Sequence, residues 1–361
     1  MKRKMMKDSL TWMMLSLVLV VSCTKSGAPS SESVCFSVGL AGNGITRTAY
    51  SHDGTYTDGV LTKERIDWSD GDLVTVYSPE AMKTDWTHDA DYRVVSHQTS
   101  SDNLMSRAAV VATDAAGKGL TWEAGTTNHF YGMYPSAGMF GSSDVGYGWI
   151  ALDEKTLKGT IPAAQTLTWT GRTGSGDIKG SPDMRYAWMF AKASGRKGDD
   201  EVNLVFYPKF TAFEFTIGSG ENPTVTLSSF KLETTDTASG AFLTGNFSMD
   251  GDSEAVTVAS TGATKAITVN FPSGTVVTPE KSLTFTVLAL PKDLTKLQIW
   301  FTGTEIGERK LVLDDGDGEP LSFTACKKYR FSGLSFPSLL TATGEDIIWD
   351  LEAHGEGLKW Y

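Results

Sequence analysis

Short runs in which apolar and polar residues alternate account for most of the chain after residue 33. Such a period of two places one side of a β-strand in a core and the other side toward water. Asp-Gly pairs, which favour tight turns, separate many of the runs, as at Asp70-Gly71 and Asp250-Gly251. We therefore predict an all-β fold of many short strands, with short helical pieces near 104–107 or 293–297. The clearest alternating runs are 34–38, 73–77, 213–217, 256–258 and 283–287.

One cluster of glycine and proline residues interrupts the alternation more strongly than the others. The segment 218–223 (GSGENP) follows a strong predicted strand and precedes a new series of strands. Clusters of this composition are common at domain boundaries. We place the boundary there and expect two β-sandwich domains in tandem, at 34–219 and 220–361, because the chain is long enough for two domains.

The first 23 residues have a different pattern. A basic head at 2–7 precedes an apolar run from Leu10 to Val21, which is too short for a membrane-spanning helix of roughly 20 residues. Small residues and Cys23 follow, so the segment resembles a bacterial lipoprotein signal with its lipobox. The resemblance implies that residues 1–22 are cleaved off, that Cys23 is acylated, and that 23–33 form a flexible tether. An ordinary secretory signal with a chance cysteine is the alternative.

The charge balance and the few cysteines restrict the classes of partner. The formal net charge is −11, and an acidic surface repels phosphate backbones, so no nucleic-acid partner is expected. Besides Cys23 the chain has Cys35 and Cys326, and the sequence leaves open whether these two form a disulfide. The histidines are isolated from one another, and the acidic groups at 67–72 and 314–319 lack the ligand spacing of a known calcium loop. We expect neither a metal site nor a cofactor.

Several short patterns occur in an order that resembles one protein family. They are RTAY at 47–50, IDWSDGDLVTV at 66–76, FYGMYP at 130–135, IPAAQT at 161–166, FKL at 230–232, LTG at 243–245 and VLALP at 287–291. This order, together with the lipobox, resembles the fimbrillin-like family, the subunits of type V pili and related surface lipoproteins. Family members often carry a His-Ala pair in the strand before the domain boundary, where this chain has YPKFTA at 207–212. The resemblance implies two transthyretin-like β-sandwiches of the Greek-key type.

For polymerising members, the resemblance implies that an arginine-specific protease removes the first strand at the cell surface. The groove left behind accepts an extended segment of another subunit, whose main chain supplies hydrogen bonds and whose alternate side chains fill pockets. In this chain the released strand would present Val34, Phe36 and Val38, and cleavage would fall between Arg47 and Thr48. The alternative interpretation of Arg47 is an ordinary arginine of a surface loop.

The incoming donor segment would be the C-terminal tail. Ile347, Trp349 and Leu351 form an apolar set at alternate positions near the end of the chain, as a strand that fills a groove requires. The alternative is that the tail is the last strand of its own domain. The sequence does not decide between these two interpretations.

These observations favour an outer-membrane lipoprotein at the cell surface or in a fimbrium. It would be a pilus subunit, or a tip or anchor component, with a role in adhesion; the sequence does not choose among the three. Its partners would be other pilin subunits, the membrane through acylated Cys23, and a host or bacterial surface receptor.

The alternative function is a surface glycan-binding lipoprotein of a carbohydrate-uptake system, which would share the anchor, the β-sandwiches and the aromatic residues. Tyr131, Tyr134 and Pro135 could form a sugar platform, although their spacing fits a core better. No catalytic motif stands out, so we do not expect an enzyme.

Overall fold

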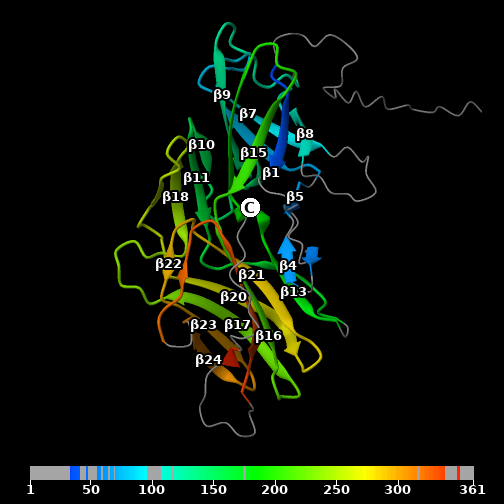
Figure 1. The fold of residues 1–361 in the computed structure, drawn as a ribbon, viewed down its shortest axis with the longest axis vertical. Helices are drawn as coiled ribbons and strands as arrows, with labels where there is room; N and C mark the ends of the chain where they lie inside the picture. Colours follow the sequence, from blue (N-terminus) through cyan, green and yellow to red (C-terminus); the bar gives the residue numbers. More distant parts are fainter. Residues whose placement is uncertain are drawn as a thin grey trace, which may run out of the picture.

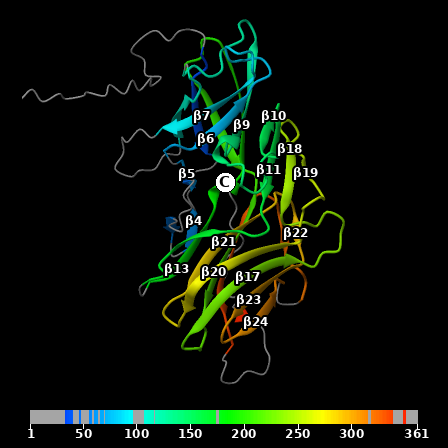
Figure 2. The same ribbon diagram turned by 180° about the vertical axis from the view of Figure 1, so that it is seen from behind.

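The fold is all-β, as the alternating pattern predicts, and contains only two short 3-10 helices in the part of the chain that the structure describes. The computed structural model describes residues 33–40, 46–47, 55–57, 60–63, 66–68, 70–95, 107–115, 117–173, 176–314, 318–337 and 348–349. The 3-10 helices are η1 (Ala137–Met139) and η2 (Met184–Tyr186). Figures 1 and 2 show an elongated molecule with one group of strands in the upper half and another in the lower half.

The upper group is a closed barrel of seven strands. Adjacent strands of the barrel are antiparallel, except that β1 runs parallel to β15. Inward side chains of the strands form one continuous core. Around the ring the order is β1 (Phe36–Leu40), β15 (Val202–Pro208), β14 (Met189–Arg196), β9 (Thr127–Tyr134), β6 (Leu73–Tyr77), β7 (Asp89–Val95) and β8 (Arg107–Ala112).

The lower group is a sandwich of two sheets around a second core that is rich in phenylalanine. The larger sheet has the order β12 (Leu167–Thr170), β13 (Ile178–Pro182), β21 (Leu283–Ala289), β16 (Thr211–Gly218), β26 (Lys328–Ser335) and β27 (Ile348–Trp349). The smaller sheet has the order β20 (Ala266–Val277), β17 (Val225–Thr234), β23 (Leu297–Gly303) and β24 (Gly307–Val312).

A third sheet joins the two groups. It consists of β10 (Ala151–Asp153), β11 (Thr156–Ile161), β18 (Gly245–Asp250) and β19 (Val256–Val258). Its core combines Leu157 and Phe247 with Met133 of the barrel and Ala212 of the sandwich. Three two-stranded pairs complete the fold: β2 (Thr46–Arg47) with β5 (Ile66–Asp67), β3 (Thr55–Thr57) with β4 (Val60–Lys63), and β22 (Leu294–Thr295) with β25 (Ser322–Phe323).

The expected boundary at 219/220 falls at a turn inside the sandwich. β16 ends at Gly218 in one sheet, and β17 begins at Val225 in the opposite sheet. Strands that precede the turn, such as β13, belong to the same sheet as β21 and β26. The glycine-rich turn therefore carries the chain from one layer of the sandwich to the other. Gly220 has φ +64° and lies against the carbonyl of Phe336, where a Cβ atom would collide.

Two further expectations differ from the structure. The upper group is a closed barrel rather than an open sandwich, because β1 hydrogen-bonds to both β8 and β15 and joins the ends of the sheet. The helical piece expected at 293–297 is wrong, since β22 occupies Leu294–Thr295 and pairs with β25.

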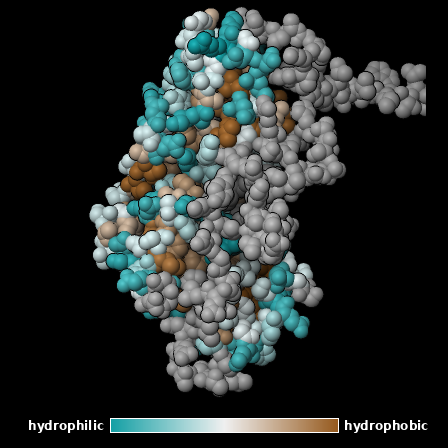
Figure 3. Space-filling model, in the orientation of Figure 1, coloured by the Kyte–Doolittle hydropathy of each residue, from teal (hydrophilic) through white to brown (hydrophobic). Residues whose placement is uncertain are grey.

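Figure 3 shows hydrophilic residues over much of one face, with apolar groups in separate patches.

Candidate functional site

β1 makes the last joint of the barrel ring. On one side Phe36, Val38 and Leu40 pair in parallel with Val202, Leu204 and Phe206 of β15. On the other side Ser37 to Gly39 pair in antiparallel fashion with β8. Figure 1 shows β1 between these two neighbours in the upper half of the molecule. The N-terminal strand therefore has main-chain partners along both edges, and without it the barrel would have two open edges.

The three side chains predicted for the apolar face of this strand all lie in the barrel core. Val34, Phe36 and Val38 are buried. The Phe36 ring makes edge contacts with Tyr92 and Phe130, with ring centroids 5.1 and 5.0 Å away. Burying an apolar side chain of this size stabilises a fold by about 1.5–3 kcal/mol, as an upper estimate. All three side chains belong to the same hydrophobic cluster of the barrel.

Polar contacts hold the same strand at its start and on its other side. The amide of Val34 donates to the carbonyl of Leu120 at 2.9 Å, and Val202 donates to the carbonyl of Cys35 at 2.8 Å. Ser37 alternates away from the core, yet it is buried, and its hydroxyl donates to Asn203 Oδ1 at 3.2 Å. The strand is therefore an integrated part of the barrel rather than a loose extension.

The structure places only part of the other predicted site. Arg47 is the second residue of β2 and pairs in parallel with Asp67 of β5. Trp349 belongs to β27 and pairs in antiparallel fashion with Leu334 at the edge of the larger sandwich sheet. Arg47 and Trp349 thus both lie in β-strands, and these strands belong to different sheets. The calls on Cys23, Thr48, Ile347 and Leu351 lie outside the described residues.

A buried amide marks the point where the C-terminal segment leaves the sandwich, and sequence reasoning did not single it out. The Asn222 side chain donates from Nδ2 to the carbonyls of Ser219 at 2.8 Å, Pro337 at 3.0 Å and Phe336 at 3.4 Å. These contacts fix the end of β26 against the turn that follows β16. The only signal in the sequence is the Asn-Pro pair inside the GSGENP cluster.

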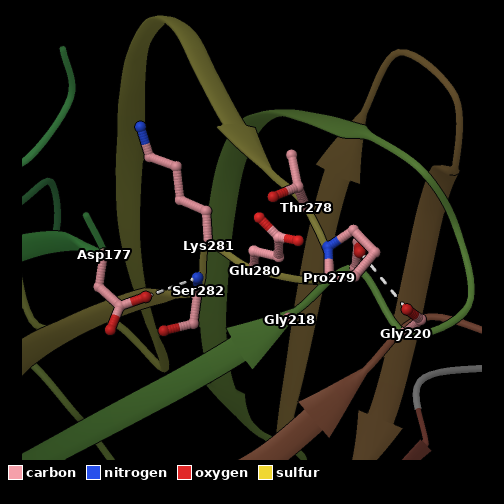
Figure 4. Close-up of a pocket in the computed structure, with 9 residues that line it drawn as sticks. Asp177, Gly218, Gly220, Thr278, Pro279, Glu280, Lys281 and Ser282 are labelled. Atoms are coloured by element: carbon pink, nitrogen blue, oxygen red, sulfur yellow. Dashed lines mark hydrogen bonds between the residues drawn. The ribbon is translucent and has the colours of Figure 1, made fainter. Parts of the chain in front are cut away.

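A pocket of about 350 Å³ opens beside the same turn (Figure 4). It lies between the turn at 218–220 and the β20–β21 connection at 278–282, with Asp177 on its rim. Asp177 accepts a hydrogen bond from the amide of Ser282 at 2.9 Å, and Figure 4 shows this contact between two residues that line the pocket. Since the Asp177 carboxylate already accepts a backbone amide, it serves to hold two connections together.

A group of charged side chains is buried on the outer side of the larger sandwich sheet. Glu214 of β16 accepts hydrogen bonds from Lys328 Nζ at 2.7 Å and Arg330 Nε at 2.6 Å, both on β26. Lys328 is only 2% exposed, and burial lowers the pKa of its ammonium group. Lys328 and Arg330 both pair with the Glu214 carboxylate, and this pairing offsets the cost of burying charged groups.

Cys326 has a free thiol, so the structure contains no bond between Cys35 and Cys326. Burial raises the pKa of the Cys326 thiol to about 11. The thiolate is the reactive form of cysteine, and at neutral pH it is therefore nearly absent. Cys326 acts as a small, partly buried side chain in the β25–β26 connection.

The aromatic residues considered as a sugar platform face inward. Tyr131 and Tyr134 are buried, and the Trp68 ring packs edge-on against Tyr134, with ring centroids 5.3 Å apart.

In the described ranges, no three acidic, histidine or cysteine side chains gather in a way that could hold a metal ion. The same ranges include no helix with the length and apolar character that crossing a membrane requires.

Comparisons with known proteins give structural neighbours only. No protein-family model and no curated protein matches the chain. Two solved structures named "putative cell adhesion protein" are similar over most of both chains: one from Bacteroides ovatus (13% identity, 91% of this chain and 98% of that chain, TM-score 0.49) and one from Bacteroides uniformis (16% identity, 85% and 95%, TM-score 0.48). A fimbrial assembly protein from Parabacteroides distasonis is similar at 10% identity over 88% and 99%, with a TM-score of 0.36.

These neighbours carry names of the kind that the sequence resemblance implies, namely cell adhesion and fimbrial proteins. With TM-scores below 0.5, the likeness carries no argument about what this chain does. The argument for function has to come from the chain's own residues.

Proposed function

We propose that this chain is an exported, lipid-anchored subunit of a surface fibre, and that it assembles with other subunits by strand exchange. Residues 1–22 act as the export signal, Cys23 carries the lipid, and 23–33 form the tether. In this proposal the barrel corresponds to the first of the two tandem transthyretin-like domains, and the sandwich corresponds to the second. The subunit serves adhesion as shaft, tip or anchor component, and a surface receptor is its further partner.

The position of β1 is the observation that supports this proposal. β1 is the first strand of the described chain and provides the joint between β8 and β15, and the segment 34–38 places Val34, Phe36 and Val38 in the barrel core. Cleavage after Arg47, seven residues beyond Leu40, would separate the strand from the rest of the chain. Its loss would leave two unpaired strand edges, which another extended segment can satisfy.

The C-terminal tail is the proposed donor of that segment. β27 pairs with β26 at the edge of the larger sandwich sheet over two residues only. Within the described residues, release of the tail would break only this two-residue pairing. In a neighbouring subunit, Ile347, Trp349 and Leu351 would then fill the pockets that Val34, Phe36 and Val38 occupy before cleavage.

Identification of the N-terminus of the protein recovered from the cell surface tests this proposal. We expect the chain extracted from surface filaments to begin at Thr48, and the Arg47→Gln variant to keep acylated Cys23 at its start. Arg65→Gln, which changes the next arginine along the chain, is the matched control and should be processed normally. If mass spectrometry finds only the acylated Cys23 form in wild-type material, the strand-exchange proposal fails.

A further inference from the structure

Trp86 combines two features that both cost stability. Its side chain is 79% exposed, more than any other large apolar residue in the described part of the chain. Its backbone has φ +68°, in the left-handed region that bulky L-residues rarely adopt. An exposed indole gains nothing from burial. When two unfavourable features coincide at one residue, a role outside folding is the physical explanation.

The segment that carries Trp86 is held in a fixed shape. Trp86 lies in the connection between β6 and β7, where its amide donates to the carbonyl of Lys83 at 3.1 Å and the Lys83 amide donates to the carbonyl of Thr87 at 2.8 Å. The Asp85 carboxylate accepts the amide and the hydroxyl of Thr87, at 3.1 and 2.7 Å. The indole is therefore presented on a small, closed turn rather than on a loose loop.

The base of this connection is attached to the barrel. Met82 forms an isolated bridge with Thr121, and the Thr121 hydroxyl donates to the Met82 carbonyl at 2.7 Å. His88 Nδ1 lies 3.0 Å from the Ser78 carbonyl and 3.1 Å from the Ala81 carbonyl, so it closes the base from the other side. Because base and tip are both hydrogen-bonded, the backbone that carries the indole keeps its shape when a ligand approaches, and less backbone entropy is lost on binding.

The neighbours of Trp86 indicate which ligand fits. The residues on either side, Asp85 and Thr87, are exposed and polar, and Lys83 contributes an ammonium group 3.9 Å from the Asp85 carboxylate. The other residues of the segment 83–87 are all polar or charged, so the chain next to the indole offers hydrogen-bonding groups. A pyranose ring has one face of C–H groups and a rim of hydroxyl groups, so it matches a single aromatic face within a polar surround.

We propose that Trp86 is the stacking platform of a carbohydrate-binding site at the β6–β7 turn, and that the ligand is a pyranose ring of a surface glycan. The neighbouring Asp85, Thr87 and Lys83 side chains are the polar groups available to the hydroxyl groups of the sugar. The site does not depend on strand exchange, because Trp86 lies outside β1 and outside the tail.

Saturation-transfer NMR with the full folded chain tests the proposal. The probes are methyl β-D-glucopyranoside, methyl β-D-galactopyranoside and methyl N-acetyl-β-D-glucosaminide. We expect wild-type protein to transfer saturation to the C–H protons of one ring face of at least one probe. In Trp86→Ala, binding of that probe should be weaker by about tenfold, the upper range for an aromatic contact. Tyr207→Ala is the matched control, because Tyr207 is a 54% exposed aromatic residue on β15.

A second variant separates binding from folding. Glycine adopts positive φ without strain, so Trp86→Gly should raise the unfolding midpoint by about 2–4 °C while weakening binding of the probe as much as Trp86→Ala does. Unchanged transfer in Trp86→Ala or Trp86→Gly overturns the proposal. So does the absence of transfer to all three probes with wild-type protein. If Trp86→Ala instead lowers self-association in sedimentation, Trp86 contacts protein, and the carbohydrate proposal is wrong.

Discussion

The barrel and the sandwich are both built around aromatic cores, yet they depend on the chain ends to different degrees. The barrel is closed by β1, the first strand of the described chain. The sandwich takes its core strands from the interior of the sequence, and its only terminal strand, β27, is two residues long and lies at an edge. Strands near the two ends of the described chain therefore differ in their importance: β1 closes the barrel, whereas β27 adds a two-residue pairing at the edge of the sandwich.

The two cores also differ in how they tolerate the loss of one element. Phe230 in the sandwich contacts the rings of Phe215, Phe285 and Phe301, which come from three different strands. Phe36 in the barrel belongs to β1, the first strand of the described chain, and contacts the rings of Tyr92 and Phe130. Because the sandwich network connects many interior strands, we expect it to stay folded when the barrel opens.

Removal of β1 is expected to have the largest effect. A chain that begins at Thr48 loses both ladders of β1 and its three buried side chains, so amides of β8 and β15 should lose protection from hydrogen exchange. Amides of β17 and β23 should keep theirs. A synthetic peptide of residues 33–40 should restore protection in the barrel, since it can pair again with both open edges.

A chain shortened after Pro337 is the control for this deletion. It lacks the tail but keeps the Asn222 contacts, so the barrel amides should stay as protected as in the full chain. If the β1 deletion exposes β17 and β23 to the same extent as β8 and β15, the two halves fold as one unit and the comparison fails.

Phe36→Ala should destabilise the barrel next most strongly, by about 3–5 kcal/mol, because truncation leaves a cavity between Tyr92 and Phe130. Ser37→Ala, which removes only one hydrogen bond, should cost about 1 kcal/mol. Denaturant unfolding monitored separately for each half measures both values. Similar losses for the two variants would mean that β1 is not packed into the core as described.

Lys328→Met tests the sandwich side of the comparison. Removing one partner of a buried ion pair costs about 3–5 kcal/mol, and we expect the low end, because Arg330 still pairs with Glu214. Lys327→Met, one residue earlier and only half-buried, should change stability by less than about 0.5 kcal/mol. Equal or higher stability of Lys328→Met would show that the buried pair costs more than it contributes.

A dependence on alkaline pH that comes from Cys326 should have a smaller effect than Phe36→Ala or Lys328→Met. The pKa of its thiol is raised from 9.0 to about 11 in the folded protein, so the unfolded chain loses this proton first as the pH rises. The stability that the protonated thiol contributes is present below pH 9 and is lost between pH 9 and 11, by about 2–3 kcal/mol at most. Comparison with Cys326→Ala in denaturant series at pH 8 and 11 isolates this contribution, and parallel curves would refute it.

Local alternation predicts strands and their inward residues well where one face is buried. Val34, Phe36 and Val38 are an example, because a period of two determines which side chains share a face. The same pattern does not tell which sheet a strand joins. β12 and β13 lie before the expected boundary yet pair into the sandwich, and this depends on long-range pairing that no local pattern encodes.

Polar residues at alternate positions show a second limit on what the alternating pattern predicts about burial. Glu214 lies between Phe213 and Phe215 and is predicted to face water, yet it is buried against Lys328 and Arg330. Alternation indicates that Glu214 points away from the phenylalanine core, but not that the other side of the sheet is also covered. Trp86 has no signal at all, since a single tryptophan in the polar run KTDWTHD has no periodicity.

The parallel joint between β1 and β15 has a mechanical consequence. β15 ends at Pro208 and β16 begins at Thr211 in the sandwich, so β15 and its parallel neighbour β1 both run toward the sandwich (Figure 1). A pull on the N-terminus against the sandwich would load β1 along its axis, in shear. All the hydrogen bonds of both ladders would then share the force and fail together instead of unzipping one by one. Before any cleavage, a subunit tethered through its N-terminus would therefore bear drag from flowing fluid as shear along both ladders of β1.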